Sequence, residues 1–240
     1  MKSTFFWVAG VVLAVFALAF APVLWHMMAD PAAVSTVEAP QTLPWQIDRL
    51  DDGATRVLGL TLGRTTLAEV RKRWGDELTL ALVARDGEAG ALEAFVDSTQ
   101  LGFVSARLVF TAQLDAATLQ ELRVHAVKSQ LQPSGVRRYT LSSVDRTRSE
   151  QAVVTGLTVL PSAPVDAALL TQRFGAPDQQ VQTQVPDAEG GAPQTQSNWL
   201  YPARGLAVAF DAQGHAVFQY VAPRDFARLR EPLVKSQAGN

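Results

Sequence analysis

The sequence predicts an α+β protein: an N-terminal transmembrane helix followed by two similar repeats, in which helices pack on an antiparallel sheet. Three observations support this prediction. The chain opens with a long apolar stretch that has no charged residue, and one short motif occurs twice. After each motif, short apolar runs alternate with turn residues, which is the pattern of strands joined by hairpins.

The apolar stretch from Phe5 to Met28 contains no formally charged residue. A helix of roughly 20 apolar residues is long enough to cross the hydrocarbon core of a bilayer. Lys2 precedes the stretch and Asp30 follows it, so the positive-inside rule predicts a cytoplasmic N-terminus and a periplasmic C-terminal part. Trp7 and Trp25 lie near the two ends, where the membrane interface favours aromatic side chains. We therefore expect a single-pass inner-membrane protein.

Two other interpretations of this stretch stay open. Ala19-Phe20-Ala21 fits the cleavage pattern of a signal peptide, and cleavage there would release the rest of the chain into the periplasm. Pro22 follows at once and is expected to hinder that cleavage. A buried core helix is the other interpretation, and the length and position of the stretch argue against it. The absence of cysteine excludes a lipoprotein anchor and a disulfide framework.

Composition divides the remainder of the chain. Pro31, Pro40 and Pro44 occur among small and polar residues, as in an extended linker. The predicted organisation is an anchor or signal at 1–28, a linker at 29–53, a first repeat at 54–150, a second repeat at 151–235 and a tail at 236–240.

The repeated motif marks the start of each repeat. It reads GLTLGRTTLAEVRKRWG at residues 59–75 and GLTVLPSAPVDAALLTQRFG at residues 156–175. Each version has a short apolar run and then a helical pattern that ends in arginine, an aromatic residue and glycine. Thr66 and Glu69 fit a capping box, in which a hydroxyl and a carboxylate satisfy backbone N–H groups at a helix start. In the second version, Pro164 fits the first turn of the helix.

Further elements follow from periodicity and turn residues. Strands are expected at 57–62, 78–83, 92–96, 103–110, 136–144, 153–160, 199–201, 206–210 and 216–221. One helix is expected to begin at Asp115 and to carry Leu119, Leu122 and Ala126, and a short one is expected at 225–230. Residues 145–150 are expected to form a charged turn, and residues 186–197 a long surface loop.

The sequence marks no catalytic, cofactor or metal site. The formal net charge of -2 is too small to indicate a nucleic-acid partner. The three histidines, at 26, 125 and 215, form no H-E-x-x-H motif, and there is no phosphate loop or dinucleotide fingerprint. No serine has G-x-S-x-G around it. The carboxylate pairs Asp51-Asp52 and Asp76-Glu77 are expected to be solvated turn residues. We therefore expect a protein that is not an enzyme and has no cofactor.

Several of these residues carry a resemblance to a known family. Gly59-Leu60-Thr61-Leu62-Gly63, the helix start at Thr66 and Arg173-Phe174-Gly175-Ala176-Pro177 resemble SmpA/OmlA-type and β-lactamase-inhibitor-protein-like repeats. Trp199-Leu200-Tyr201 and the final hairpin resemble the closing sheet of the same family. The resemblance implies tandem units with helices on one face of an antiparallel sheet. It also implies protein binding or envelope assembly rather than catalysis.

We therefore expect a membrane-anchored protein that presents a binding or scaffolding module to another envelope protein in the periplasm. Two alternatives stay open. One is a periplasmic cell-wall hydrolase with an unmarked site, since such an enzyme needs only two suitably separated carboxylates. The other is an inhibitor or regulator of such an enzyme.

The expected partner surface lies in the second repeat. The strand at residues 206–210 is apolar on both sides of the pleat, whereas a strand with one buried face alternates. One of its sides therefore either packs between the two repeats or meets a partner. Trp199 and Tyr201 are suitable anchors for a partner, because large aromatic residues dominate many protein interfaces. The candidate partner-binding residues are Trp199, Tyr201 and Ala207.

Overall fold

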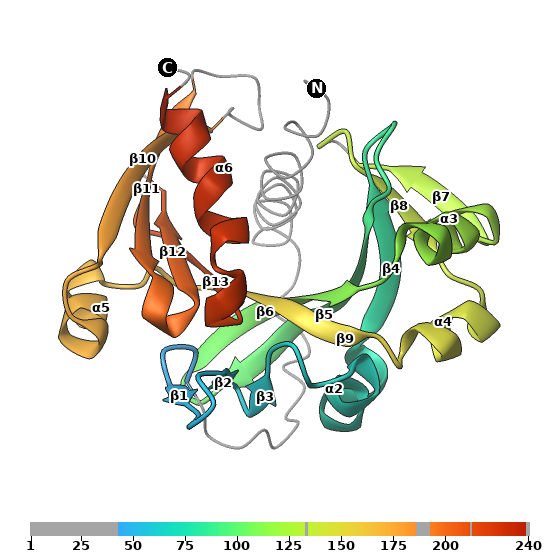
Figure 1. Cartoon of the computed structure of the whole chain (residues 1–240), viewed down its shortest axis with the longest axis horizontal. Helices are drawn as coiled ribbons and strands as arrows, with labels where there is room; N and C mark the ends of the chain where they lie inside the picture. Colours follow the sequence, from blue (N-terminus) through green and yellow to red (C-terminus); the bar gives the residue numbers. More distant parts are fainter. Residues whose placement is uncertain (1–42, 133, 186–192, 212, 239–240) are drawn as a thin grey trace.

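A computed structural model describes residues 43–132, 134–185, 193–211 and 213–238. In this part the chain is a mixed α+β protein, with five α-helices and a large antiparallel sheet (Figure 1). The expected α+β class is confirmed at this level. The predicted membrane segment, residues 5–28, lies outside the described residues. Among the described helices, none combines the length and the apolar character that crossing a bilayer requires.

The large sheet contains ten strands, and each strand runs antiparallel to its neighbours. Its order is β10 (Gln179–Val185), β11 (Gln194–Tyr201), β12 (Leu206–Phe210), β13 (Ala216–Val221), β9 (Val153–Pro161), β6 (Val104–Gln113), β5 (Ala91–Leu101), β4 (Thr79–Ala84), β8 (Arg137–Thr140) and β7 (Lys128–Leu131). β9 is central, because it pairs with β6 on one side and β13 on the other. The predicted strands at 206–210 and 216–221 are confirmed as the neighbours β12 and β13.

The helices of the repeated motif are α2 (Leu67–Trp74) and α5 (Ala167–Phe174). Thr66 and Glu69 form the predicted capping box at the start of α2. The carboxylate of Asp166 caps α5, so Pro164 precedes this helix and does not lie in its first turn as predicted. Each helix ends at a glycine with positive φ, a conformation that costs glycine little.

The main core lies between α2 and α5 and one side of the large sheet, which we call the core face. Trp74 at the end of α2 is 1% exposed, and its ring centroid is 5.3 Å from that of Phe110 on β6. Phe174 at the end of α5 packs on Tyr201 of β11, with ring centroids 5.5 Å apart. Burial of large aromatic side chains thus joins each helix to the sheet.

A small sheet precedes α2 and consists of β1 (Ile47–Arg49), β2 (Thr55–Val57) and β3 (Leu60–Thr61). The single strand predicted at 57–62 is wrong, because a two-residue turn divides it. Leu58 and Gly59 form this turn with φ of 50° and 74°, as a type I′ hairpin requires. The backbone N–H of Gly63 donates to the carbonyl of Val154 at 2.8 Å and so attaches this hairpin to β9.

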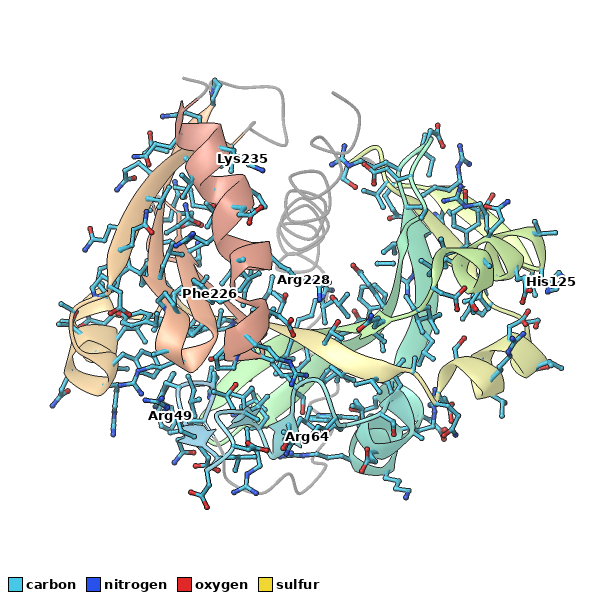
Figure 2. All side chains as sticks on the ribbon, viewed as in Figure 1. Arg49, Arg64, His125, Phe226, Arg228 and Lys235 are labelled. Atoms are coloured by element: carbon cyan, nitrogen blue, oxygen red, sulfur yellow. The ribbon has the colours of Figure 1, made fainter. Side chains whose placement is uncertain are left out.

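The opposite side of the sheet, which we call the second face, is covered at one end by α6 (Ala227–Ala238) (Figure 1). Phe226, Leu229 and Leu233 pack there against side chains of β10 to β13 (Figure 2). The helix predicted at 225–230 is therefore longer than expected. It extends into the predicted tail, because Leu233 is also buried.

Other differences from the predictions occur where polar residues form regular structure. The predicted charged turn is part of helix α4 (Ser143–Ser149), which Ser142 caps. Helix α3 (Ala116–Val124) begins after Asp115 as predicted but ends before Ala126. Strands β7 and β10 were not predicted, and β11 begins inside the predicted loop at 186–197. These strands are rich in glutamine, lysine and serine, so they lack the apolar alternation that marks a strand.

Candidate protein-binding edge at strand β7

Two of the three candidate residues from the sequence lie inside the fold. Tyr201 is 2% exposed, and its hydroxyl donates to the carbonyl of Gly175 at 3.3 Å. Ala207 is 3% exposed and belongs to the apolar cluster under α6. Trp199 is partly buried on the core face, with its ring centroid 5.1 Å from that of Phe210.

These positions explain why β12 is apolar on both sides. The main core covers one side, and α6 covers the other. The expected partner surface at Tyr201 and Ala207 is therefore covered by the chain itself. On the second face of this strand, α6 covers Ala207, whereas Ala209 lies in another buried apolar cluster together with Phe95 and Val109 of the first repeat.

An open surface occurs instead at β7, which is one edge of the large sheet. All four residues of β7 are exposed, and among the described strands its only neighbour in the sheet is β8. The backbone N–H of Gln132 donates to the carbonyl of Val136 at 2.8 Å. With the register of β7 and β8, this bond shows which residues of β7 direct their backbone groups toward β8 and which direct them away. In an antiparallel pair, every second residue directs its backbone groups away from the neighbouring strand. Ser129 and Leu131 are these residues, so their N–H and C=O groups face the open edge.

Exposed aliphatic side chains lie next to this edge. Val127 is 71% exposed just before β7, and Leu131 is 56% exposed at its end. Because side chains alternate along a strand, Ser129 and Leu131 share one side of the pleat. Val127 precedes β7, and its backbone N–H donates to the carbonyl of Thr140 at 2.9 Å. Val124 at the end of α3 and Val144 in α4 are 70% and 75% exposed. Exposed apolar side chains that gather in one region are typical of interaction sites.

The other side of the pleat borders a hollow of about 270 Å³ between β7, β8 and β4. Its lining includes Lys128, Gln130, Arg138 and Thr140. Neither Lys128 nor Arg138 forms an ion pair within the described residues, although Arg138 lies over the ring of Phe95 at 4.6 Å. The hollow therefore has a positive lining that is available to an acidic group.

Glu93 lies beside this hollow on β5, because its cross-strand neighbour Ala81 forms part of the lining. Glu93 is 2% exposed and forms no hydrogen bond among the described residues. Burial raises the pKa of this carboxyl to about 7, and the positive charge of Arg138 offsets part of the rise. Sequence reasoning missed Glu93, although a carboxylate between Leu92 and Ala94 in an apolar strand was a usable signal.

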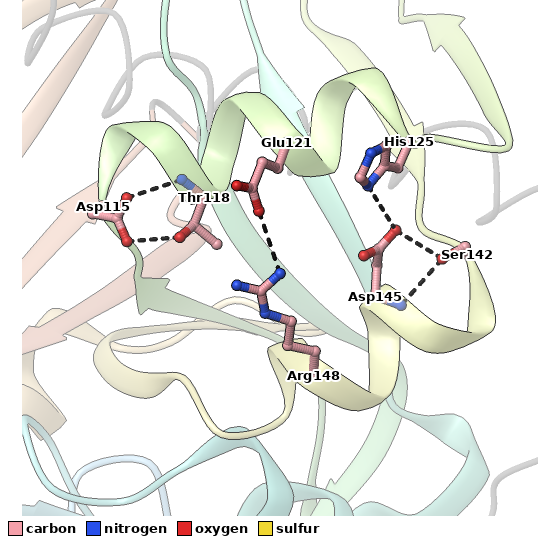
Figure 3. Close-up of polar contacts among 7 residues, drawn as sticks. All are labelled: Asp115, Thr118, Glu121, His125, Ser142, Asp145 and Arg148. Atoms are coloured by element: carbon pink, nitrogen blue, oxygen red, sulfur yellow. Dashed lines mark hydrogen bonds and ion pairs between the residues drawn. The ribbon is translucent and has the colours of Figure 1, made fainter.

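Polar contacts between α3 and α4 hold the structure beside the edge (Figure 3). Glu121 and Arg148 form an ion pair at 3.3 Å, and Nδ1 of His125 lies 3.9 Å from a carboxylate oxygen of Asp145. The guanidinium of Arg123 donates to the carbonyl of Ala89 at 3.2 Å, which attaches α3 to the start of β5. These contacts join α3 to α4 and to the start of β5.

No family model, curated protein or solved structure matches this chain. Within the described part of the chain, no three histidine or acidic side chains gather in a way that could hold a metal ion. The candidate site therefore depends on the geometry and charge of the β7 edge alone.

Proposed function

We propose that this chain is a single-pass inner-membrane protein of a bacterial envelope, and that its periplasmic part binds an extended segment of another envelope protein at β7. The apolar stretch at residues 5–28 supports the membrane anchor. The open edge at β7 supports the binding function. An extended segment that adds to an exposed sheet edge is a common mode of protein recognition.

The proposal includes an internal duplication of the folded part. α2 precedes the strands β4, β5 and β6, and α5 precedes β10 to β13. Val70 and Leu170 occupy matched positions in the two helices, and both are fully buried. α3 follows the first group of strands, and α6 follows the second. These matches support two similar helix-on-sheet repeats that share the central strand β9.

The outward backbone groups of Ser129 and Leu131 carry the binding proposal. They offer two donors and two acceptors to an added strand. Four hydrogen bonds at about 1 kcal/mol each correspond to a Kd of only about 1 mM. Covering part of Val127 and Leu131 adds about 1–2 kcal/mol per side chain, which brings the affinity toward the micromolar range. The backbone therefore sets the mode of binding, and the aliphatic side chains make it stable.

The two sides of β7 also define the chemistry of the partner. Side chains of an added strand alternate between the side of Ser129 and Leu131 and the side of the positive hollow. The matching segment carries apolar residues on the first side and acidic residues on the second. Lys128 and Arg138 are the charges that the acidic residues meet.

A synthetic seven-residue peptide of alternating valine and glutamate tests this proposal. Titration calorimetry with the full-length chain in detergent micelles is expected to give a micromolar Kd. Ser129→Pro removes the outward N–H and is expected to weaken binding at least tenfold, because proline cannot donate to an added strand. Ser129→Ala is the matched control and is expected to bind as the parent does. Equal binding by the proline and alanine variants would disprove strand addition at β7.

The membrane anchor is tested separately. A reporter that is active only in the periplasm is expected to be active when fused after Asn240. The full-length protein is expected to stay with membranes after a carbonate wash. A shorter soluble product would show instead that the chain is cleaved near Ala21 and secreted.

A further inference from the structure

A second hollow lies far from β7 in the fold, between the small sheet and the end of α5. Its volume is about 420 Å³, within the range of small-molecule sites. Trp45, Leu58 and Phe174 supply apolar lining. The short 3-10 helix η2 (Pro202–Arg204) contributes Arg204.

Three arginine side chains line this hollow. Arg56 is paired with Asp48 at 3.1 Å, so these two charges offset each other. Arg173 forms no hydrogen bond or ion pair within the described residues. Arg204 lies over the ring of Phe174 at 5.3 Å and forms no ion pair there either. Two positive charges therefore remain without an anionic partner in the hollow.

The matched end of α2 shows that unpaired arginines are not a general property of these helices. Arg71 forms an ion pair with Glu150 and donates to the carbonyl of Gly75 at 3.1 Å. Arg73 is partly buried, and burial lowers its pKa. A terminal nitrogen of Arg73 lies 2.8 Å from the place that a Cβ would take at Gly59, which also lines the hollow.

We propose that this hollow binds a phosphate monoester. A planar guanidinium matches two oxygens of a phosphate at once, and two such groups suit an anion of nearly two negative charges. Trp45 and Phe174, which are 7% and 8% exposed, offer small apolar contacts to the organic part of the ligand. The C-terminal end of α5 disfavours an anion, so the arginine side chains and not the helix must hold the phosphate.

The ligand has two possible sources, a soluble phosphate ester and a phosphate monoester headgroup of the membrane. Trp45 lies within the predicted linker at residues 29–53. If the proposed anchor is correct, the 29–44 part of the linker spans at most about 55 Å, so the hollow can reach the membrane surface. The phosphate chemistry is the same for both sources.

Phenyl phosphate is a suitable soluble probe, and 31P NMR titration of the full-length chain in phosphorus-free detergent measures its binding. The double variant Arg173→Gln/Arg204→Gln is expected to bind at least tenfold more weakly than the parent. Arg146→Gln/Arg228→Gln removes the same charge from two exposed arginines on α4 and α6 and is expected to leave binding unchanged. Figure 2 labels Arg228. Arg173→Lys keeps the charge but loses the planar fork, and it is expected to bind with intermediate affinity.

The same titration in bilayer discs assigns the source. If discs that contain phosphatidic acid weaken phenyl phosphate binding relative to phosphatidylcholine discs, the membrane headgroup occupies the hollow. If both discs give the affinity found in detergent, the ligand is soluble. Absence of phenyl phosphate binding by the parent, or equal loss in both double variants, would overturn the proposal. Neither result depends on whether a strand binds at β7.

Discussion

The two edges of the large sheet differ in what covers them. At β10, α6 lies over the second face and buries Val181, while Asn198 of β11 donates to the hydroxyl of Thr183 at 3.0 Å. At β7, all four residues are exposed, and α3 lies closest to β4. The helix thus buries one side of the pleat of β10, whereas both sides of β7 stay exposed.

The largest effect is expected where each helix of the motif joins the sheet. Trp74→Ala and Phe174→Ala each remove a buried aromatic side chain, which usually costs 3–5 kcal/mol. The loss of unfolding free energy is expected to be larger for Trp74→Ala, because Trp74 is the more completely buried of the two. Urea unfolding measures both losses. If either variant unfolds at the urea concentration of the parent, the corresponding helix does not contribute to the main core.

The next effect tests the role of α6 at the β10 edge. Leu229→Ala removes a side chain through which α6 packs on the sheet and is expected to destabilise the protein by about 2–5 kcal/mol. Val144→Ala is the control at the β7 end, and it is expected to stay within about 0.5 kcal/mol of the parent because Val144 is exposed. Equal losses at the two positions would show that the edges do not differ as described.

The sequence predicted the elements with apolar patterns and missed the strands that consist mostly of polar residues. The capping box at Thr66 and the strand pair β12 and β13 follow from local patterns, and both are confirmed. β7 and β10 consist mostly of polar residues, and what makes them strands is pairing with distant neighbours. No local pattern records such pairing, because strand propensity depends strongly on context.

The candidate site was unpredictable for a related reason. Trp199, Tyr201 and Ala207 were candidates because β12 is apolar on both sides. The sequence correctly indicated that both sides are covered, but it did not indicate that α6 covers Ala207 on the second face. The sequence shows an amphipathic pattern around Leu229 but not which strands it meets. Because α6 covers β12, the candidate surface lies instead at β7, whose four residues are exposed.

The buried carboxyl of Glu93, beside the hollow at β7, makes the stability of the fold depend on pH. The pKa of its carboxyl is about 7 in the folded chain, against an ordinary value of 4.5. Between these values the folded state holds a proton that the unfolded state has lost, so stability falls as pH rises through this window. The shift corresponds to a loss of about 3 kcal/mol above pH 7.

Glu93→Gln removes this titration and provides the measurement. The unfolding free energy of the variant minus that of the parent is expected to increase from pH 4.5 to pH 7, because only the parent loses stability in this range. Above pH 7 this difference is expected to stay constant. Using the difference cancels the other titrating groups, which both proteins share. A difference that does not vary with pH would show that Glu93 is not buried in a site of low polarity.

The smallest effect on stability is expected from single cysteine substitutions on the two edge strands, which also test directly which edge binds the peptide. The chain contains no cysteine, so Ser129→Cys on β7 and Gln182→Cys on β10 each create a unique labelling position. Both side chains are exposed, and each substitution is expected to change the unfolding free energy by less than about 0.5 kcal/mol. A photoactivatable group on each thiol then reports whether the valine–glutamate peptide lies within reach.

Capture is expected from Ser129→Cys and not from Gln182→Cys. An added strand at β10 meets glutamine side chains on one side and α6 on the other, because Val181 is already buried. At β7 the same strand covers Val127 and Leu131 and places its acidic residues against Lys128. Capture from both positions would show that any open edge of the sheet accepts the peptide. Capture from Gln182→Cys alone would place the binding edge at β10 and remove the role assigned here to β7.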